Sequence, residues 1–202
     1  MENPYEFLIK DTTYERFLRC NLTLNLELET RDVQSPRDYA KTSFVGGEIE
    51  IPKHINQGLR IEDFVENYCR EVLKCKPDDI IWAEVNKHEH HSKTYSLKPF
   101  GWSFSNSTAG IIYISKADVR KDYGVKRVTK SLEDTIISRF ADELKRYTQW
   151  VNGRVYLAAI KNDKDEVIDM HGELYNVADD IDSEINDMLN NLGFSSDCQE
   201  KS

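Results

Sequence analysis

The sequence predicts an α+β domain with a largely antiparallel sheet, two or three packed helices and an acidic C-terminal helix. Leucines alternate with polar residues over 22–28, which is the two-residue period of a strand with one buried face. Apolar residues recur at helical spacing over 61–72 and 136–147. The predicted strands and helices are grouped rather than strictly alternating, and such grouping favours an α+β architecture.

The organisation expected from the sequence is one domain with two extensions. Residues 1–20 are predicted to form a helical lead-in, 21–193 a single α+β domain, and 194–202 a flexible tail. The 202 residues are enough for one domain with a real core. No internal repeat and no low-complexity linker divides the chain.

The strands are predicted from alternation and from short apolar runs. After 22–28, a second strand covers 44–51, kinked or bulged at Gly46–Gly47 and stopped by Pro52. Further strands are expected over 78–87 and 110–116, followed by a hairpin over 153–172 that turns around 162–165. Both faces of 155–160 are apolar, which favours a central strand.

The helices are predicted from spacing and from their ends. Residues 60–74 form an amphipathic helix, and 116–124 form one or two turns closed by Gly124. The strongest helix opens at Ser131, with Asp134 as a weak capping-box partner. Residues 88–110 are expected to form a polar-aromatic loop or an irregular hairpin. Its aromatic residues are candidates either for partner anchors or for the core: Tyr95, Phe100, Trp102 and Phe104.

The charge of the chain is concentrated near its C-terminus. The net charge is −9, yet Asp165–Glu200 carries eleven acidic residues and no Lys or Arg, which leaves the rest of the chain at +2. No apolar run is long enough to span a bilayer, and the polar N-terminus does not resemble a signal peptide. A cytoplasmic protein without membrane contact is therefore expected. The four cysteines form no C-x-x-C pair and are expected to be reduced.

The acidic C-terminal segment has two interpretations. Asn176 as N-cap, Gly193 at C′ and a stripe of apolar residues predict a docked helix with an ordinary solvated face. The helix dipole, however, needs only one or two carboxylates, and no Lys or Arg lies at i+4 to offset the others. The second interpretation is a partner-binding surface. Its candidate residues are Asp179, Asp180, Asp182, Glu184 and Asp187, with Asp169 and Glu173 of the hairpin and Trp102 of the aromatic loop.

Two motifs stand out in the middle of the chain: a Ser-Pro-Arg-acid-aromatic loop, here Ser35 to Tyr39, and the strand and basic helix "GIIYISKADVRKDYG". With these motifs, roughly residues 22–175 resemble a family of small proteins from phages, plasmids and conjugative elements of Gram-positive bacteria. The family implies no activity. It implies a genomic neighbourhood in which small acidic proteins antagonise host defence, as anti-CRISPR proteins do.

Two alternatives involve chemistry or nucleic acid. No metal or cofactor is expected in the leading interpretation of the sequence. On an extended strand, however, Glu84, His88 and His90 point to one face and could hold a metal ion. A metal-assisted hydrolase or nuclease is therefore one alternative. A nucleic-acid-binding accessory protein is the other, although the net negative charge opposes it. Its contacts would come from Lys116, Arg120, Lys121, Lys126 and Arg127.

The leading hypothesis is a non-enzymatic inhibitor of a host defence protein. Its acidic surface would occupy the basic channel of a CRISPR nuclease or restriction complex, or of that nuclease with its nucleic acid bound. The apolar content also allows a homodimer. The sequence does not identify the target.

Overall fold

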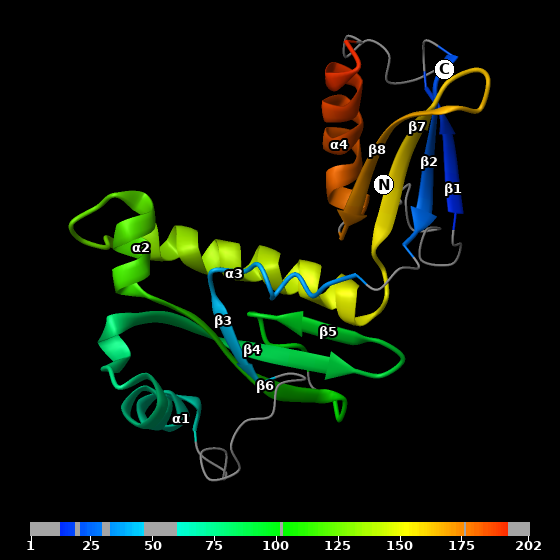
Figure 1. Ribbon diagram of the computed structural model, residues 1–202. Helices are drawn as coiled ribbons and strands as arrows, with labels where there is room; N and C mark the ends of the chain where they lie inside the picture. Colours follow the sequence, from blue (N-terminus) through cyan, green and yellow to red (C-terminus); the bar gives the residue numbers. More distant parts are fainter. Residues whose placement is uncertain are drawn as a thin grey trace. The chain divides into compact units, whose positions relative to one another are not determined.

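The computed structural model confirms an α+β fold with two antiparallel sheets (Figure 1). It describes residues 13–18, 21–29, 33–46, 60–101, 103–175 and 177–193. The chain divides into two compact units. Unit 1 comprises residues 1–34 and 149–202, and unit 2 comprises residues 35–148.

Unit 1 is built on a four-stranded sheet in the order β1-β2-β7-β8. The strands are β1 (Thr13–Phe17), β2 (Thr23–Leu28), β7 (Tyr156–Lys161) and β8 (Val167–Leu174), and all neighbours are antiparallel. Helix α4 (Val177–Asn191) runs alongside β8 (Figure 1). The sheet confirms that the residues around 155–160 form a central strand.

The core of unit 1 lies between this sheet and α4. Register pairs Leu24 with Ile160 and Leu26 with Ala158, so the alternating side chains of the two strands share one face. That face is covered by apolar residues of α4, all of them buried: Ile185, Met188 and Leu189. The predicted apolar stripe of the C-terminal helix is therefore confirmed.

Unit 2 holds the second sheet, in the order β3-β6-β4-β5. Its strands are β3 (Ser43–Gly46), β4 (Ile80–Glu89), β5 (Lys93–Ser96) and β6 (Asn106–Ser115). The helical elements are α1 (Ile61–Tyr68), the π-helical η3 (Cys69–Leu73), the 3-10 turn η4 (Pro77–Asp79) and α2 (Lys116–Tyr123). Helix α3 (Lys130–Val151) begins in unit 2 and ends in unit 1.

The sheet of unit 2 is covered on both faces. Ile111 of β6 packs in a cluster with Phe64 and Val65 of α1. On the other face, Phe44 and Tyr95 make edge and tilted ring contacts with Tyr147 of α3, with centroids 5.6 and 5.1 Å apart. Burial on both faces explains why β6 is a continuous apolar run in sequence rather than an alternating one.

The structure corrects the expectation of a helical lead-in and gives more detail on two other expectations about organisation. Residues 13–17 form strand β1, not part of a helical lead-in, because they pair with β2 along their whole length. The segment 21–193, predicted to be a single domain, contributes to two compact units. Over 88–110, where a loop or an irregular hairpin was expected, β5 pairs with β4 and β6 begins, which agrees with the hairpin; of the two roles considered for Tyr95, the structure shows the core.

The predictions for the ends of the helices are partly confirmed. The N-terminus of α3 is capped by Thr129, whose hydroxyl accepts from the backbone N–H of Leu132 at 3.3 Å, and not by Ser131. Gly124 and Gly193 both adopt positive φ at helix C-termini, as predicted. The predictions for Asn176, for residues 47–52 and for residues 194–202 concern positions outside the described residues. None of the described helices combines the length and apolarity needed to cross a membrane.

Candidate functional site

The two units differ in charge. Unit 1 contains 19 acidic and 8 basic residues, a net charge of −11, whereas unit 2 contains 17 acidic and 19 basic residues, a net charge of +2. The negative charge that the sequence places near the C-terminus therefore belongs to one compact unit. A field of one sign on one unit steers oppositely charged partners toward that unit.

The β7–β8 hairpin holds part of this charge on an ordered turn. The side-chain oxygen of Asn162 accepts from the backbone N–H groups of Lys164 and Glu166, at 2.9 and 3.0 Å. Asp165 adopts a φ of 63° and pairs with Lys161 at 2.9 Å. Asp163 is exposed and has no ion-pair partner among the residues that the structure describes. The turn thus presents carboxylates from a fixed backbone.

The two predicted partner-binding residues of β8 are placed differently. The Asp169 carboxylate is three-quarters covered: one oxygen accepts from the backbone N–H of Met170 at 2.9 Å, and the other lies 3.9 Å from the His171 ring. Glu173 is exposed at a φ of 62°. Glu173, which also accepts a long hydrogen bond of 3.5 Å from the Tyr175 hydroxyl, is therefore exposed to a partner, whereas Asp169 is largely covered.

The remaining predicted partner residues lie on α4 and in the aromatic loop. Asp187 is exposed on the helix, between the buried Ile185 and Met188. The backbone at Asp179, Asp180, Asp182 and Glu184 is helical, but their side chains are outside the described residues, as is Trp102. In the same loop Phe104 is 96 % exposed, and Phe100 lies 5.7 Å from the His88 ring.

The histidine-rich strand does not bring together the candidate metal ligands of the hydrolase alternative. Glu84 and His88 are four residues apart on β4, a separation of about 13 Å along a strand, which is too far for two ligands of one metal ion. Each is also engaged elsewhere, Glu84 with the Thr108 hydroxyl at 2.7 Å and His88 with the Asn106 side chain at 2.7 Å. His90 lies beyond the end of β4. No group of three metal-ligating side chains occurs among the described residues.

The basic segment is an exposed surface of unit 2. Lys116 pairs with Glu133 at 2.9 Å, so its charge is partly offset. The other four predicted bases are exposed, and none has an ion pair within the described part of the chain: Arg120, Lys121, Lys126 and Arg127. Helix α2 is capped at both ends. The Ser115 hydroxyl accepts from the backbone N–H of Asp118 at 3.0 Å at the N-terminus, and Gly124 adopts the left-handed conformation at the C-terminus.

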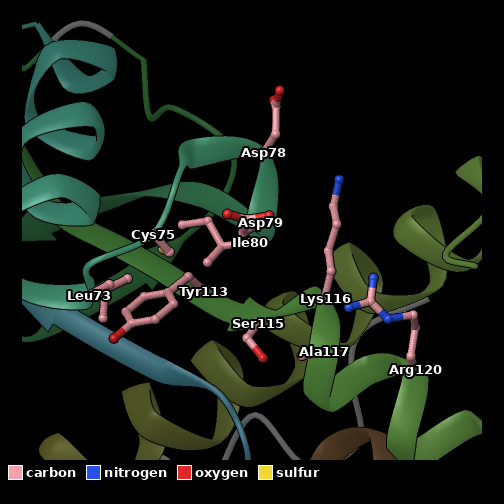
Figure 2. A pocket seen from close by; sticks show the side chains of 10 residues that line it. All are labelled: Leu73, Cys75, Asp78, Asp79, Ile80, Tyr113, Ser115, Lys116, Ala117 and Arg120. Carbon is pink, nitrogen blue, oxygen red and sulfur yellow. The ribbon is translucent and has the colours of Figure 1, made fainter.

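A pocket lies beside this helix that the sequence analysis did not identify. Antiparallel pairing of Ile80 with Ser115 brings η4, which precedes β4, next to α2, which follows β6. The resulting cavity has a volume of about 370 Å³ (Figure 2). Its lining combines apolar, acidic and basic side chains: Leu73, Cys75, Asp78, Asp79, Ile80, Tyr113, Ser115, Lys116, Ala117 and Arg120.

The inner wall of the pocket adjoins buried ionisable groups. Burial, with a smaller contribution from the neighbouring Cys75 thiol, raises the pKa of the Cys69 thiol to about 12. Burial also raises the pKa of Tyr68, which lies 5.9 Å from the Tyr113 ring. These groups stay neutral near pH 7, so the charge at the pocket comes from its rim alone.

The comparisons with known proteins add no relative. No family model, no curated protein and no solved structure matches the chain.

Proposed function

We propose that this chain is a binding protein of a mobile genetic element that inhibits a nucleic-acid-handling host defence protein, such as a CRISPR nuclease or a restriction complex. In this proposal unit 1 contacts a basic channel of the target. The observation that supports the proposal is the concentration of a net charge of −11 in unit 1, against +2 in unit 2. The resemblance to small proteins of phages and plasmids is the reason for choosing a defence protein as the target.

The described carboxylates of unit 1 suit such a contact. Asp163 and Asp187 are exposed, and neither has an ion-pair partner within the described residues, so binding to a cation would not first require breaking an internal pair. Both lie on ordered elements, the β7–β8 turn and α4. Rigid carboxylates replace phosphates in an Arg- and Lys-lined groove with little loss of conformational entropy.

The test is protection of an infecting phage. A bacterial strain with an active CRISPR or restriction system plates a targeted phage poorly, and expression of the protein is expected to raise the plating efficiency. The variant Asp180→Lys, Asp182→Lys, Glu184→Lys and Asp187→Lys is expected to lose this effect, because it reverses the charge of α4. The purified target should bind the native protein more weakly as salt rises.

A matched control carries the same charge change in unit 2. The variant Glu62→Lys, Glu66→Lys, Asp134→Lys and Asp142→Lys reverses four exposed carboxylates of α1 and α3. It should still protect the phage if unit 1 is the contact. Equal loss in both variants would mean that only total charge matters, and full protection by the α4 variant would overturn the proposal.

A second candidate function is nucleic-acid binding through α2 and the segment after it. The four exposed bases without described ion pairs favour it: Arg120, Lys121, Lys126 and Arg127. An electrophoretic shift assay at low and moderate salt tests this function directly. Binding that weakens on reversal of Lys126 and Arg127, and is unchanged by reversal of the α4 carboxylates, would favour it over the inhibitor proposal.

A further inference from the structure

The pocket of unit 2 separates its charges into two sides. Figure 2 shows Asp78 and Asp79 above the entrance, and Lys116 and Arg120 on the side formed by α2. The Tyr113 ring and the apolar side chains of Leu73 and Ile80 line the part of the pocket that lies away from Lys116 and Arg120, with Ile80 beside Asp79. A ligand that fills this space needs an apolar, preferably flat body with an anion at one end and a hydrogen-bond donor at the other.

On the cationic side, the groups that can bind an anion are side chains and not the backbone N–H groups at the start of α2. The N–H of Asp118 is already taken by Ser115, and the Ser115 hydroxyl donates to the Asp118 carboxylate at 2.6 Å. Lys116 shares its charge with Glu133 at 2.9 Å. Arg120 is exposed and has no ion pair within the described chain, so its guanidinium is the group best able to hold an anion.

The acidic side offers acceptors. Asp79 accepts from the backbone N–H of Lys76 at 3.0 Å, which fixes its orientation at η4. Asp78 is exposed beside it, with no hydrogen bond or ion pair in the described residues. Carboxylates at this position accept from an amino group and repel a second anion.

We propose that this pocket binds a cytosine or adenine nucleotide, in which the base carries an exocyclic amine. The phosphate would pair with Arg120, the base would lie against Tyr113 and Ile80, and the exocyclic amine would donate to Asp78 or Asp79. A volume of about 370 Å³ lies within the range of small-ligand pockets. Base stacking on an aromatic ring and a charge-assisted phosphate contact are the usual sources of such affinity. The proposal concerns unit 2 and does not depend on the inhibitor proposal for unit 1.

Cys75 supplies a probe inside the pocket. It is half-buried and lines the cavity, whereas Cys69 behind it is fully buried. The full-length protein is treated with iodoacetamide, and the alkylation rate of the Cys75 peptide is followed by mass spectrometry. CMP is expected to slow this alkylation, and UMP, which carries a carbonyl in place of the amine, is expected to require about tenfold higher concentration.

Two substitutions on adjacent residues provide the decisive comparison. In Arg120→Glu, CMP should no longer protect Cys75 from alkylation. Lys121→Glu makes the same charge change outside the pocket lining, and CMP should still protect Cys75 in that variant. Arg120→Gln removes the positive charge without introducing a negative one, and it should weaken CMP binding about tenfold even if Arg120→Glu perturbs the fold. Asp78→Asn should reduce the preference for CMP over UMP.

Other outcomes overturn the proposal. Protection by inorganic phosphate at the same concentration as CMP would show a plain anion site. If cytidine, which lacks the phosphate, protected Cys75 as well as CMP does, the proposed pairing of Arg120 with the phosphate would be wrong. The proposal also fails if none of the nucleotides protects Cys75. A 5′-phosphorylated oligonucleotide ending in cytosine distinguishes a strand end from a free nucleotide as the source of the same chemistry.

Discussion

Arg37 and Glu143 are separated by 106 positions in the chain, yet the Arg37 guanidinium donates to the Glu143 carboxylate at 2.6 Å. The same guanidinium donates to the hydroxyl and carbonyl oxygens of Thr42, at 3.1 and 2.9 Å. The Thr42 hydroxyl also donates to Glu143. The Ser-Pro-Arg loop, one of the motifs behind the family resemblance, therefore connects the segment before β3 to α3 through these hydrogen bonds.

Removing either partner of this pair should destabilise the protein. The Arg37 and Glu143 side chains are only 11 % and 26 % exposed, so Glu143→Ala leaves a largely buried guanidinium without its carboxylate. The expected loss is about 3 kcal/mol in the free energy of unfolding, measured by urea denaturation. Arg37→Lys should also be costly, because an ammonium group cannot make the same forked contacts.

An exposed ion pair of the same unit serves as the control. Lys41 pairs with Asp122 at 2.9 Å, but the lysine side chain is 74 % exposed. Asp122→Ala should cost less than about 1 kcal/mol. Equal costs at Glu143 and Asp122 would show that the Arg37 cluster adds nothing beyond a surface pair.

The protein should lose stability as pH rises above about 9. The Cys69 thiol ionises near pH 9 in the unfolded chain, but burial raises its pKa to about 12 in the folded state. The folded form therefore resists deprotonation that the unfolded form undergoes, and the difference favours unfolding between those values. Urea denaturation at pH 7.5 and pH 9.8 measures the loss.

The alkaline range must be chosen with the tyrosines in mind. The pKa values of Tyr68 and Tyr156 are also raised by burial, from an ordinary value of 10.0, so their effect begins at higher pH. Below pH 10 the loss should come chiefly from Cys69 and should shrink in Cys69→Ala. An unchanged pH profile in that variant would contradict the assignment.

Replacing Gly124, which ends α2, should lower the stability of the protein. It adopts a φ of 63°, and a Cβ there would meet no atom within 4 Å, so the cost of a substitution comes from backbone conformation alone. Gly124→Ala is expected to lower stability by about 1 kcal/mol, and Gly124→Asn by less, because Asn tolerates the left-handed region. Thermal unfolding of both variants checks this order.

Zinc should not stabilise the protein through the histidine-rich strand. Glu84 and His88 are held about 13 Å apart by the strand, and each already has a hydrogen-bond partner. Thermal unfolding with and without zinc should give the same midpoint, in native protein and in His88→Ala. A rise with zinc that His88→Ala removes would restore the metal-dependent alternative.

A fragment covering residues 33–152 should fold on its own. It contains the complete second sheet, all of α3 and the hydrogen bond from the Trp150 indole to the Val33 carbonyl at 2.9 Å. Its core has both faces of the sheet covered, by α1 and by α3. A cooperative thermal transition in the isolated fragment is the expected result, and a molten, non-cooperative transition would contradict it.

Much of the fold could be predicted because its elements depend on local patterns. Alternation over 22–28 identified β2, and the apolar stripe over 136–147 identified α3, since in both cases one face of the element is buried. Strand β1 was missed because its conformation comes from pairing with β2, which periodicity within 13–17 does not reveal.

The two-unit division and the pocket could not be predicted for related reasons. One crossing between the units falls inside the continuous helix α3, so no Pro- or Gly-rich linker marks it. The pocket depends on the register that pairs Ile80 with Ser115, and the residues involved come from segments more than thirty positions apart. Register between distant strands is a tertiary property that a single sequence does not display.

The order in which the chain is synthesised gives the discontinuity of unit 1 a further consequence. Thr23 of β2 pairs with Lys161 of β7, so the N-terminal strands leave the ribosome long before their partners exist. The four strands of unit 2 can form their own sheet during that interval. Until translation passes β7, the leucine-rich face of β2 stays exposed in the nascent chain. There it can bind chaperones or lead to aggregation.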